Sequence, residues 1–145
     1  MTTDEKVSEY TYADDNSFYF AYSASLRVFG QNLDFESISA GLRLQPTNTH
    51  RKGDVGRTSK PYDADLWSYT FPLDESKPLQ EHIDGLWTRL KPHKEYILDL
   101  KRQSKIDVFL GCRSSCEWAG VEVPHTSLEM FIELGVPFGL SIVVA

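Results

Sequence analysis

The sequence FYFAYSASLRVF, residues 18–29, alternates between two kinds of side chain. Successive side chains of a strand point to opposite faces, so this period of two predicts a long strand with one buried face. One row is almost wholly apolar and contains Phe18, Phe20, Tyr22, Ala24, Leu26 and Val28. The other row is mixed and contains Tyr19, Ala21, Ser23, Ser25, Arg27 and Phe29. The strand is therefore expected in a sheet with one covered face and one open face.

Helical patterns and two more strands follow. Asp34 stands where an N-cap is expected, Pro78 opens the strongest helical pattern, and Pro92 should bend or end that helix. Pro72 closes the strand that contains Trp67, and this tryptophan is interpreted as packing under the helix over residues 79–90 rather than lying on the open face. The predicted helices cover residues 35–42, 79–90 and 96–103, and the predicted strands cover residues 66–71 and 106–113.

The C-terminal third predicts a hairpin, a short helix and a last strand. A tight turn at Ser114 and Ser115 should return the chain through residues 117–123 as the hairpin partner of the preceding strand. Thr126 and Glu129 have the spacing of a capping box, and the helix that they begin should stop at Gly135. Residues 138–144 alternate again and predict a fifth strand.

These elements predict an α+β fold. The helices carry enough apolar surface to cover one side of a sheet only. We expect a single two-layer domain over residues 18–145, with a mixed, mostly antiparallel sheet of about five strands and helices packed on one face. Residues 1–17 are predicted to form a flexible N-terminal arm. The open face is either a shallow binding platform or an ordinary solvated sheet face. Its expected small residues are Ala21, Ser23, Ser25, Ser68, Thr70, Gly111, Gly139 and Ser141.

Composition excludes several classes of protein. The chain has 145 residues, 41% of them hydrophobic and 25% charged, which is typical of one globular domain. Its apolar runs are far shorter than the ~20 residues that a membrane-spanning helix needs, so no membrane partner is expected. The N-terminus is acidic and polar, unlike a secretion signal, which predicts a cytoplasmic protein with reduced cysteines.

Charge is arranged in blocks. The formal net charge is −6, yet residues 43–60 sum to +4 and residues 62–86 sum to −5. Nucleic acid is not an expected partner, because proteins that bind it usually present a dominant basic field. An acidic domain more naturally meets a basic protein.

The sequence contains no motif that predicts catalysis, a metal or a cofactor. Cys112 and Cys116 lack the spacing and the second cluster of a zinc site, and they are either inert core thiols or a redox pair. The four histidines show no metalloprotease spacing, and no phosphate-binding or nucleophile motif occurs. Lys52, Gly53 and Asp54 fit a glycine-centred turn held by a Lys/Asp pair better than a catalytic pair. The chain is therefore not expected to be an enzyme.

Several segments together resemble the bacterial domain of unknown function family numbered 4279. The resemblance covers roughly residues 18–144 and implies a small α+β domain without a known enzyme activity. Some members of such families sit beside polymorphic toxins and act as immunity proteins. The matching segments are Leu26-Arg27-Val28-Phe29-Gly30, Leu42-x-Leu44-x-Pro46-Thr47, Arg51-Lys52-Gly53-Asp54, Trp67-Ser68, Leu134-Gly135 and Leu140-Ser141-Ile142.

Two hypotheses of function follow. The first is a cytoplasmic protein-binding domain, in particular an immunity protein that neutralises a cognate, basic toxin by tight binding. Acids beside aromatic residues suit a basic surface, and the predicted contact residues are Tyr62, Asp63, Asp65, Asp74, Glu75, Glu81 and Asp84. The second is a small-molecule binding domain or enzyme that holds an anionic ligand on the open face. It requires a pocket where its predicted ligand-binding residues converge, namely Arg27, Arg51, Lys52 and Asp54.

Overall fold

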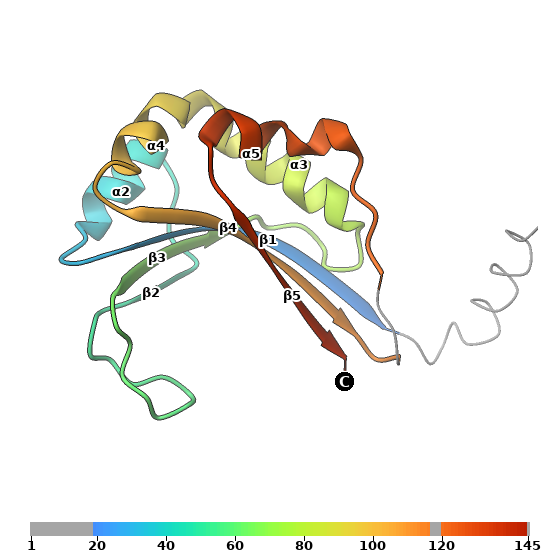
Figure 1. Ribbon diagram of the computed structural model, residues 1–145, viewed down its shortest axis with the longest axis horizontal. Helices are drawn as coiled ribbons and strands as arrows, with labels where there is room; N and C mark the ends of the chain where they lie inside the picture. The colour runs from blue at the N-terminus through green and yellow to red at the C-terminus, as the bar shows by residue number, and fades with distance from the viewer. Residues whose placement is uncertain (1–18, 117–119, 145) are drawn as a thin grey trace, which may run out of the picture.

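The computed structural model describes residues 19–116 and 120–144 and contains one five-stranded sheet. The strand order is β2-β3-β1-β4-β5, with β1 in the centre (Figure 1). Only β4 and β5 run parallel; the other neighbouring strands are antiparallel. The strands are β1 (Phe20–Gly30), β2 (Asn48–His50), β3 (Asp65–Thr70), β4 (Lys105–Ser114) and β5 (Phe138–Val144).

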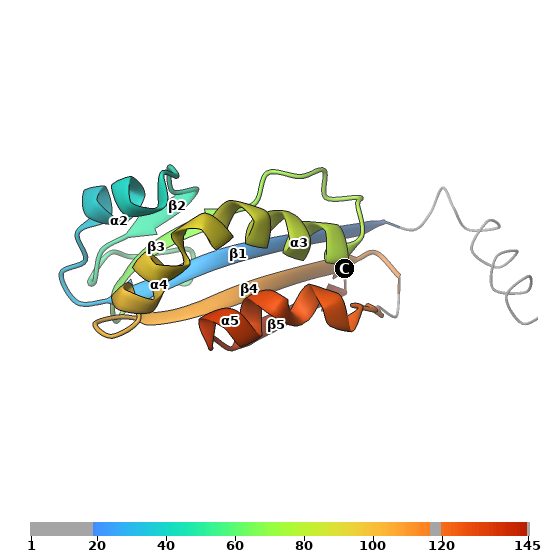
Figure 2. The same cartoon turned by 90° about the horizontal axis from the view of Figure 1, so that it is seen from above.

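The helices form a second layer on one face of the sheet. Figure 1 shows them above the strands, and Figure 2 shows α3, α4 and α5 along the central strands, with α2 at the end where β2 and β3 lie. The predicted α+β fold with one open sheet face is therefore confirmed. The predicted arm over residues 1–17 lies outside the described residues. The helices are α2 (Phe35–Leu42), α3 (Leu79–Leu90), η1 (Lys91–His93), α4 (Lys94–Leu100), η2 (His125–Leu128) and α5 (Glu129–Leu134).

One hydrophobic core joins the two layers. Ala24, Leu26 and Val28 of β1 are fully buried, as the alternating pattern predicts. The register places Val28 opposite Trp67 of β3, and Leu26 opposite Val108 of β4, so the covered rows of three strands are continuous. The same cluster contains residues from α2, α3, α4 and α5. Burial of this shared apolar surface is the main force that holds the helices on the sheet.

Most predicted helix boundaries are confirmed. The Asp34 carboxylate caps α2 by accepting from the amide of Ser37, and Pro92 falls in η1, where α3 gives way to α4. Gly135 ends α5 with a φ of 60°, a left-handed conformation that glycine adopts easily. The predicted capping box of Thr126 and Glu129 is wrong, because neither η2 nor α5 has a side-chain cap. Glu129 instead accepts a hydrogen bond from the indole of Trp87, which ties α5 to α3.

The predicted hairpin partner of β4 is also wrong. Residues 117–119 lie outside the described residues, and residues 120–124 form no strand. Both edges of β4 are already occupied, by β1 on one side and by the parallel strand β5 on the other. The strand that takes the place of this hairpin partner in the count of five is β2, which lies within the basic residues 43–60 and pairs with β3. β2 is only three polar residues long, so it has no hydrophobic period that a sequence pattern could reveal.

Trp67 has the structural role that its sequence position predicts. Its side chain is 0% exposed within the core, and its indole Nε1 donates to Ser39 Oγ on α2 over 3.1 Å. The helix that bonds to Trp67 is therefore α2, which starts one turn before Ser39. The helix expected in this place was the one over residues 79–90, which is α3.

We expect Trp67→Ala to lower the free energy of unfolding by about 3–5 kcal/mol, because it leaves a large cavity in the core and removes the hydrogen bond to Ser39. Chemical denaturation of the purified variant measures this loss. Val55→Ala is the control, since Val55 is 63% exposed and its truncation should change little. A Trp67 variant as stable as the Val55 variant would contradict the packing described above.

Candidate functional site

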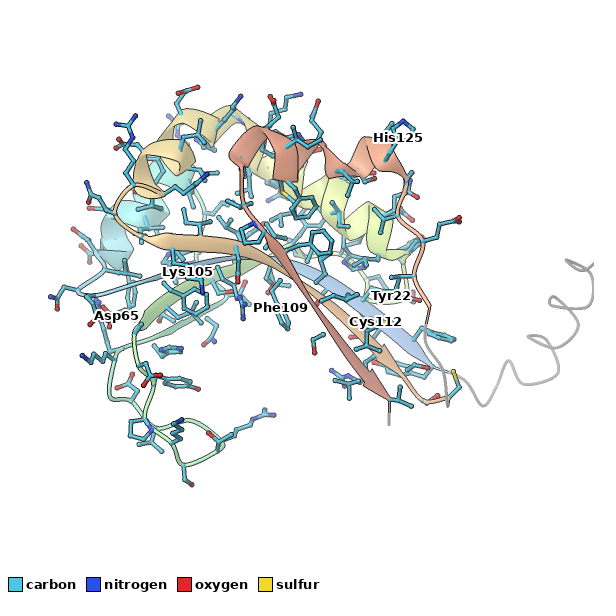
Figure 3. All side chains as sticks on the ribbon, viewed as in Figure 1. Tyr22, Asp65, Lys105, Phe109, Cys112 and His125 are labelled. Carbon is cyan, nitrogen blue, oxygen red and sulfur yellow. The ribbon has the colours of Figure 1, made fainter. Side chains whose placement is uncertain are left out.

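The open face presents the small residues that the sequence analysis placed there. The register sets Ser25 opposite Phe109, and Ser23 opposite Gly111, on the side away from the helices. Figure 3 labels Phe109 on that side of the sheet. Ser25 and Thr70 share a hydrogen bond of 2.7 Å across the β1–β3 pair. Ser25 and Ser68 are each only 7% exposed, so the larger residues around them supply most of the accessible surface here.

A ridge of four residues crosses the centre of the face. The Arg27 guanidinium donates from Nε and Nη2 to the two carboxylate oxygens of Asp107, over 2.8 Å each. The guanidinium carbon of Arg27 lies 4.5 Å from the ring centroid of Phe109 and 5.0 Å from that of Phe29. Bidentate pairing and the two cation–π contacts hold the guanidinium in one orientation. We call Phe29, Arg27, Phe109 and Asp107 the central ridge.

A hollow lies on each side of the central ridge. The first has a volume of about 420 Å³, and Arg27, Phe29, His50, Tyr62 and Asp63 are among its lining residues. His50 and Tyr62 stack with ring centroids 3.6 Å apart, and Tyr62 remains 38% exposed.

The second hollow has a volume of about 290 Å³ and lies toward the start of β1. Its lining includes Ser23, Phe109, Gly111, Arg113 and Glu75. A Cβ on Gly111 would lie 2.6 Å from Ser23 Oγ, so glycine is what leaves this hollow open. Because Phe109 borders it while Arg27 and Phe29 border the first hollow, the ridge separates the two.

The cations predicted for an anionic ligand do not converge. Arg51 lies 3.7 Å from the Phe35 ring centroid, and its Nη1 donates to the carbonyl of Leu33. Arg51 and Lys52 line a different hollow from Arg27. The single pocket that the second hypothesis required is therefore not formed.

Arg51, Lys52 and Asp54 instead build a turn. Gly53 has a φ of +91°, which favours glycine, and Asp54 accepts from the Arg51 amide over 2.9 Å. Tyr62 closes the turn, since its amide donates to the Asp54 carbonyl and its carbonyl accepts from Gly53. The predicted glycine-centred turn is thus present, but Asp54 holds it through a backbone amide rather than through Lys52.

Asp65 fixes this turn to the sheet. The residue is 4% exposed, and its carboxylate accepts from the amides of Lys52 and Leu33 and from the Arg51 guanidinium, over 2.8–2.9 Å. These donors, with the Lys52 amide contributing most, lower the pKa of Asp65 below its ordinary value of 3.8. Asp65 was predicted to contact a partner, and this prediction is wrong, because its carboxylate is buried and used within the fold. Figure 3 labels it at the start of β3.

The other predicted contact residues form two separate groups. Tyr62 and Asp63 border the first hollow. The acid group, which we define as Asp74, Glu75, Glu81 and Asp84, lies at the opposite end of β1, where the Glu75 carbonyl accepts from the Tyr22 amide. Tyr62 stacks on His50, and the sheet register places His50 level with Phe29 of β1. Glu75 lies beside Tyr22 of the same strand. Tyr62 and Glu75 are therefore separated by about seven residues of β1, or over ~20 Å. They do not make one patch.

Within the acid group, the four carboxylates differ in availability. Asp74 is occupied by the amide and hydroxyl of Ser76, at 2.8 and 2.7 Å. Glu75 accepts from the Tyr19 hydroxyl over 2.6 Å. Glu81 and Asp84 are exposed on the outer side of α3. Only Glu75 also borders the open face, through the second hollow.

Cys112 lies on the covered face, as predicted, and the two cysteines are buried and not joined by a disulfide. Ser114 Oγ lies 2.8 Å from Cys116 Sγ. Burial raises the pKa of the Cys112 thiol, which reduces its reactivity as a thiolate. Among residues 19–116 and 120–144, no group of three potential metal ligands occurs. The helices of the same described part include none that is long and apolar enough to cross a membrane.

The family described as "Domain of unknown function (DUF4279)" matches residues 20–145, and the chain therefore belongs to it. This confirms the resemblance inferred from the sequence. No curated protein and no solved structure matches the chain.

Asp65→Asn is expected to lower the melting temperature at neutral pH by about 4–8 °C, because the Arg51 guanidinium and two amides lose a charged acceptor. A folded-state pKa below 3.8 stabilises the fold at pH values above 3.8, and this stabilisation is lost as the pH falls from 3.8 through the lower folded-state pKa. Thermal melts between pH 7 and about pH 3 should therefore decline less steeply for the variant. Asp99→Asn, at a side chain 73% exposed, is the control. Equal acid slopes for the variant and the unmodified protein would refute the role of Asp65.

We expect both thiols to be free and slow to react in the native protein. Alkylation under native conditions, followed by mass spectrometry, should modify Cys112 much more slowly than in denaturant, because burial raises its pKa and limits access. A Cys112–Cys116 crosslink in rapidly alkylated protein would show that this expectation is wrong.

Proposed function

We propose that the domain is a protein-binding module whose contact surface is the open sheet face. The observation that carries this proposal is the central ridge, in which Arg27 is held between Phe29 and Phe109. Arginine and aromatic residues are enriched in the energetically dominant centre of protein interfaces. The hollows on either side offer space for side chains of a partner.

The ridge is organised before any partner arrives. Its residues stand on β1 and β4, two neighbouring strands in the centre of the sheet. The two hydrogen bonds from Arg27 to Asp107 restrict the rotamers of both side chains. A side chain that is already ordered loses less conformational entropy when a partner binds. The arrangement thus favours binding through shape and apolar contact.

The charge of the ridge argues against a small anion as the ligand. Asp107 neutralises Arg27, and its side chain is only 14% exposed. An anion would have to displace a bidentate carboxylate that is already desolvated. A protein surface can instead stack on the two phenylalanines without breaking this pair. The alternative of an anionic ligand therefore has less support than a protein partner.

The narrower proposal is an immunity protein that neutralises a basic toxin in the cytoplasm. It is supported by the family resemblance and by the net charge of −6. Asp63 and Glu75 border the two hollows, one on each side of the central ridge. Basic groups around the centre of a partner's surface would meet these acids.

The test measures binding to the product of the neighbouring gene, with Phe109→Ala and Phe29→Ala as ridge variants. Each should weaken binding by roughly 30-fold, the effect of truncating a central contact residue. Lys94→Ala is the control on the helix side, where Lys94 forms an ion pair with the exposed Glu133. Thermal melts establish that all variants remain folded.

Rescue of cells that express the neighbouring gene tests the narrower proposal. The unmodified domain should restore growth and the ridge variants should fail to do so. Binding that survives both ridge substitutions would refute the open face as the contact surface. Absence of both binding and rescue would refute the immunity proposal.

A further inference from the structure

The outer edge of β5 has no neighbouring strand within the described residues. In its parallel ladder with β4, the Val108 amide donates to the carbonyl of Pro137. Hydrogen-bonding groups of a parallel strand alternate between its two sides. The backbone groups of odd-numbered residues from 139 to 143 therefore point toward β4. Those of Phe138, Leu140, Ile142 and Val144 point outward.

This edge lacks the usual protection against pairing. Residues 135–144 contain no charged side chain, and the strand itself contains no proline. The residues with outward-pointing backbone groups are also large and apolar: Phe138, Leu140, Ile142 and Val144 are 51%, 43%, 48% and 49% exposed. Natural edge strands are commonly short or carry charges that block further pairing. The opposite edge follows that rule, since β2 has three residues, all polar.

We infer that β5 pairs with β5 of a second copy of the chain, antiparallel and about a two-fold axis. With Ser141 opposite Ser141 of the other copy, Leu140 stands opposite Ile142, and Phe138 opposite Val144. Each of these pairs joins two residues whose backbone groups point outward, so each can exchange two hydrogen bonds. The sheets of the two copies become one continuous sheet.

The side chains fit the same register. Phe138, Leu140 and Ile142 lie beside Val108, Leu110 and Cys112, which are on the covered face. Pairing even-numbered residues with even-numbered residues keeps the apolar row of both copies on that face. A two-fold interface requires one patch to complement itself, and this strand does so in backbone and in side chains. A partner with a different sequence has no such built-in match.

Charge and area also agree with a second copy. Each copy has a net charge of −6, but the uncharged edge brings no like charges into contact. The half-exposed apolar side chains and the backbone edge offer roughly 500 Å² per copy, near the lower limit of about 1,000 Å² in total for a specific interface. Association should therefore be reversible and should depend on concentration.

The dimer enlarges the open face. Ser141 and Val143 line the second hollow, and in the inferred register both lie close to the two-fold axis. The second hollows of the two copies would thus lie side by side on one surface. The pairing of β5 with its copy does not depend on the proposed function.

Sedimentation velocity over a hundredfold range of concentration tests the inference. The full chain should shift from monomer to dimer as its concentration rises. Ile142→Lys should stay monomeric, because it places a charge at the centre of the paired edge. Ile132→Lys is the matched control, since Ile132 is 76% exposed on α5 and should leave the shift unchanged. Circular dichroism establishes that both variants are folded. A full chain that is monomeric throughout, or an Ile142 variant that dimerises normally, would overturn the inference.

Crosslinking tests the register independently. Ser141→Cys should form a covalent dimer under mild oxidation, because opposed residues that are not hydrogen-bonded have Cα atoms only about 4.5 Å apart. Thr126→Cys, at an exposed position in η2, should not. The native cysteines add little background, since both are buried. Equal crosslinking of the two variants, or none at position 141, would overturn the two-fold register.

Discussion

The pairing of β1 on both of its edges is the constraint on which the core and the open face both depend. β3 and β4 fix its register from the two sides, and the period of two then assigns every side chain to a face. Leu26 and Val28 go to the core, while Ser25 and Arg27 go to the open face. A slip of one residue would expose the apolar row and bury the guanidinium. The same hydrogen bonds that specify the core therefore also set Arg27 opposite Asp107.

Asp65 has a comparable role at the corner of the sheet. It joins the loop before α2, through Leu33, to the turn after β2, through Arg51 and Lys52. The segment Arg51-Lys52-Gly53-Asp54 is part of the family resemblance, and in this structure it shapes a turn. Its arginine is used inside the fold, where it pairs with Asp65 and stacks on Phe35. Arg51 is thus a structural part of the basic stretch, and the ridge of the open face lies elsewhere.

Periodicity was enough to predict the elements with an apolar face, and it could not predict their neighbours. The strand over residues 138–144 was found from its alternation, but its parallel position beside β4 depends on the path of the chain through α5. Asp107 was missed because its partner, Arg27, is 80 residues away and only the register brings them together. Asp65 was misread as an exposed acid. A usable signal existed, since Asp65 is two residues from Trp67 and therefore shares its strand face, which the sequence analysis had placed under a helix.

The exposed charges of the domain lie on a different surface from the central ridge. Arg27 and Arg51 are both neutralised by partly or fully buried carboxylates, so their charges contribute little to the field outside the molecule. The net negative charge is instead expressed at exposed acids such as Glu81 and Asp84 on α3, away from the open face. Such charges attract a basic partner over a distance and raise its association rate, with a strong dependence on salt. In the proposed complex the central ridge, which is nearly neutral, would act only in contact and would govern how long the complex lasts. A partner that binds this domain would then be attracted by one surface and held by another.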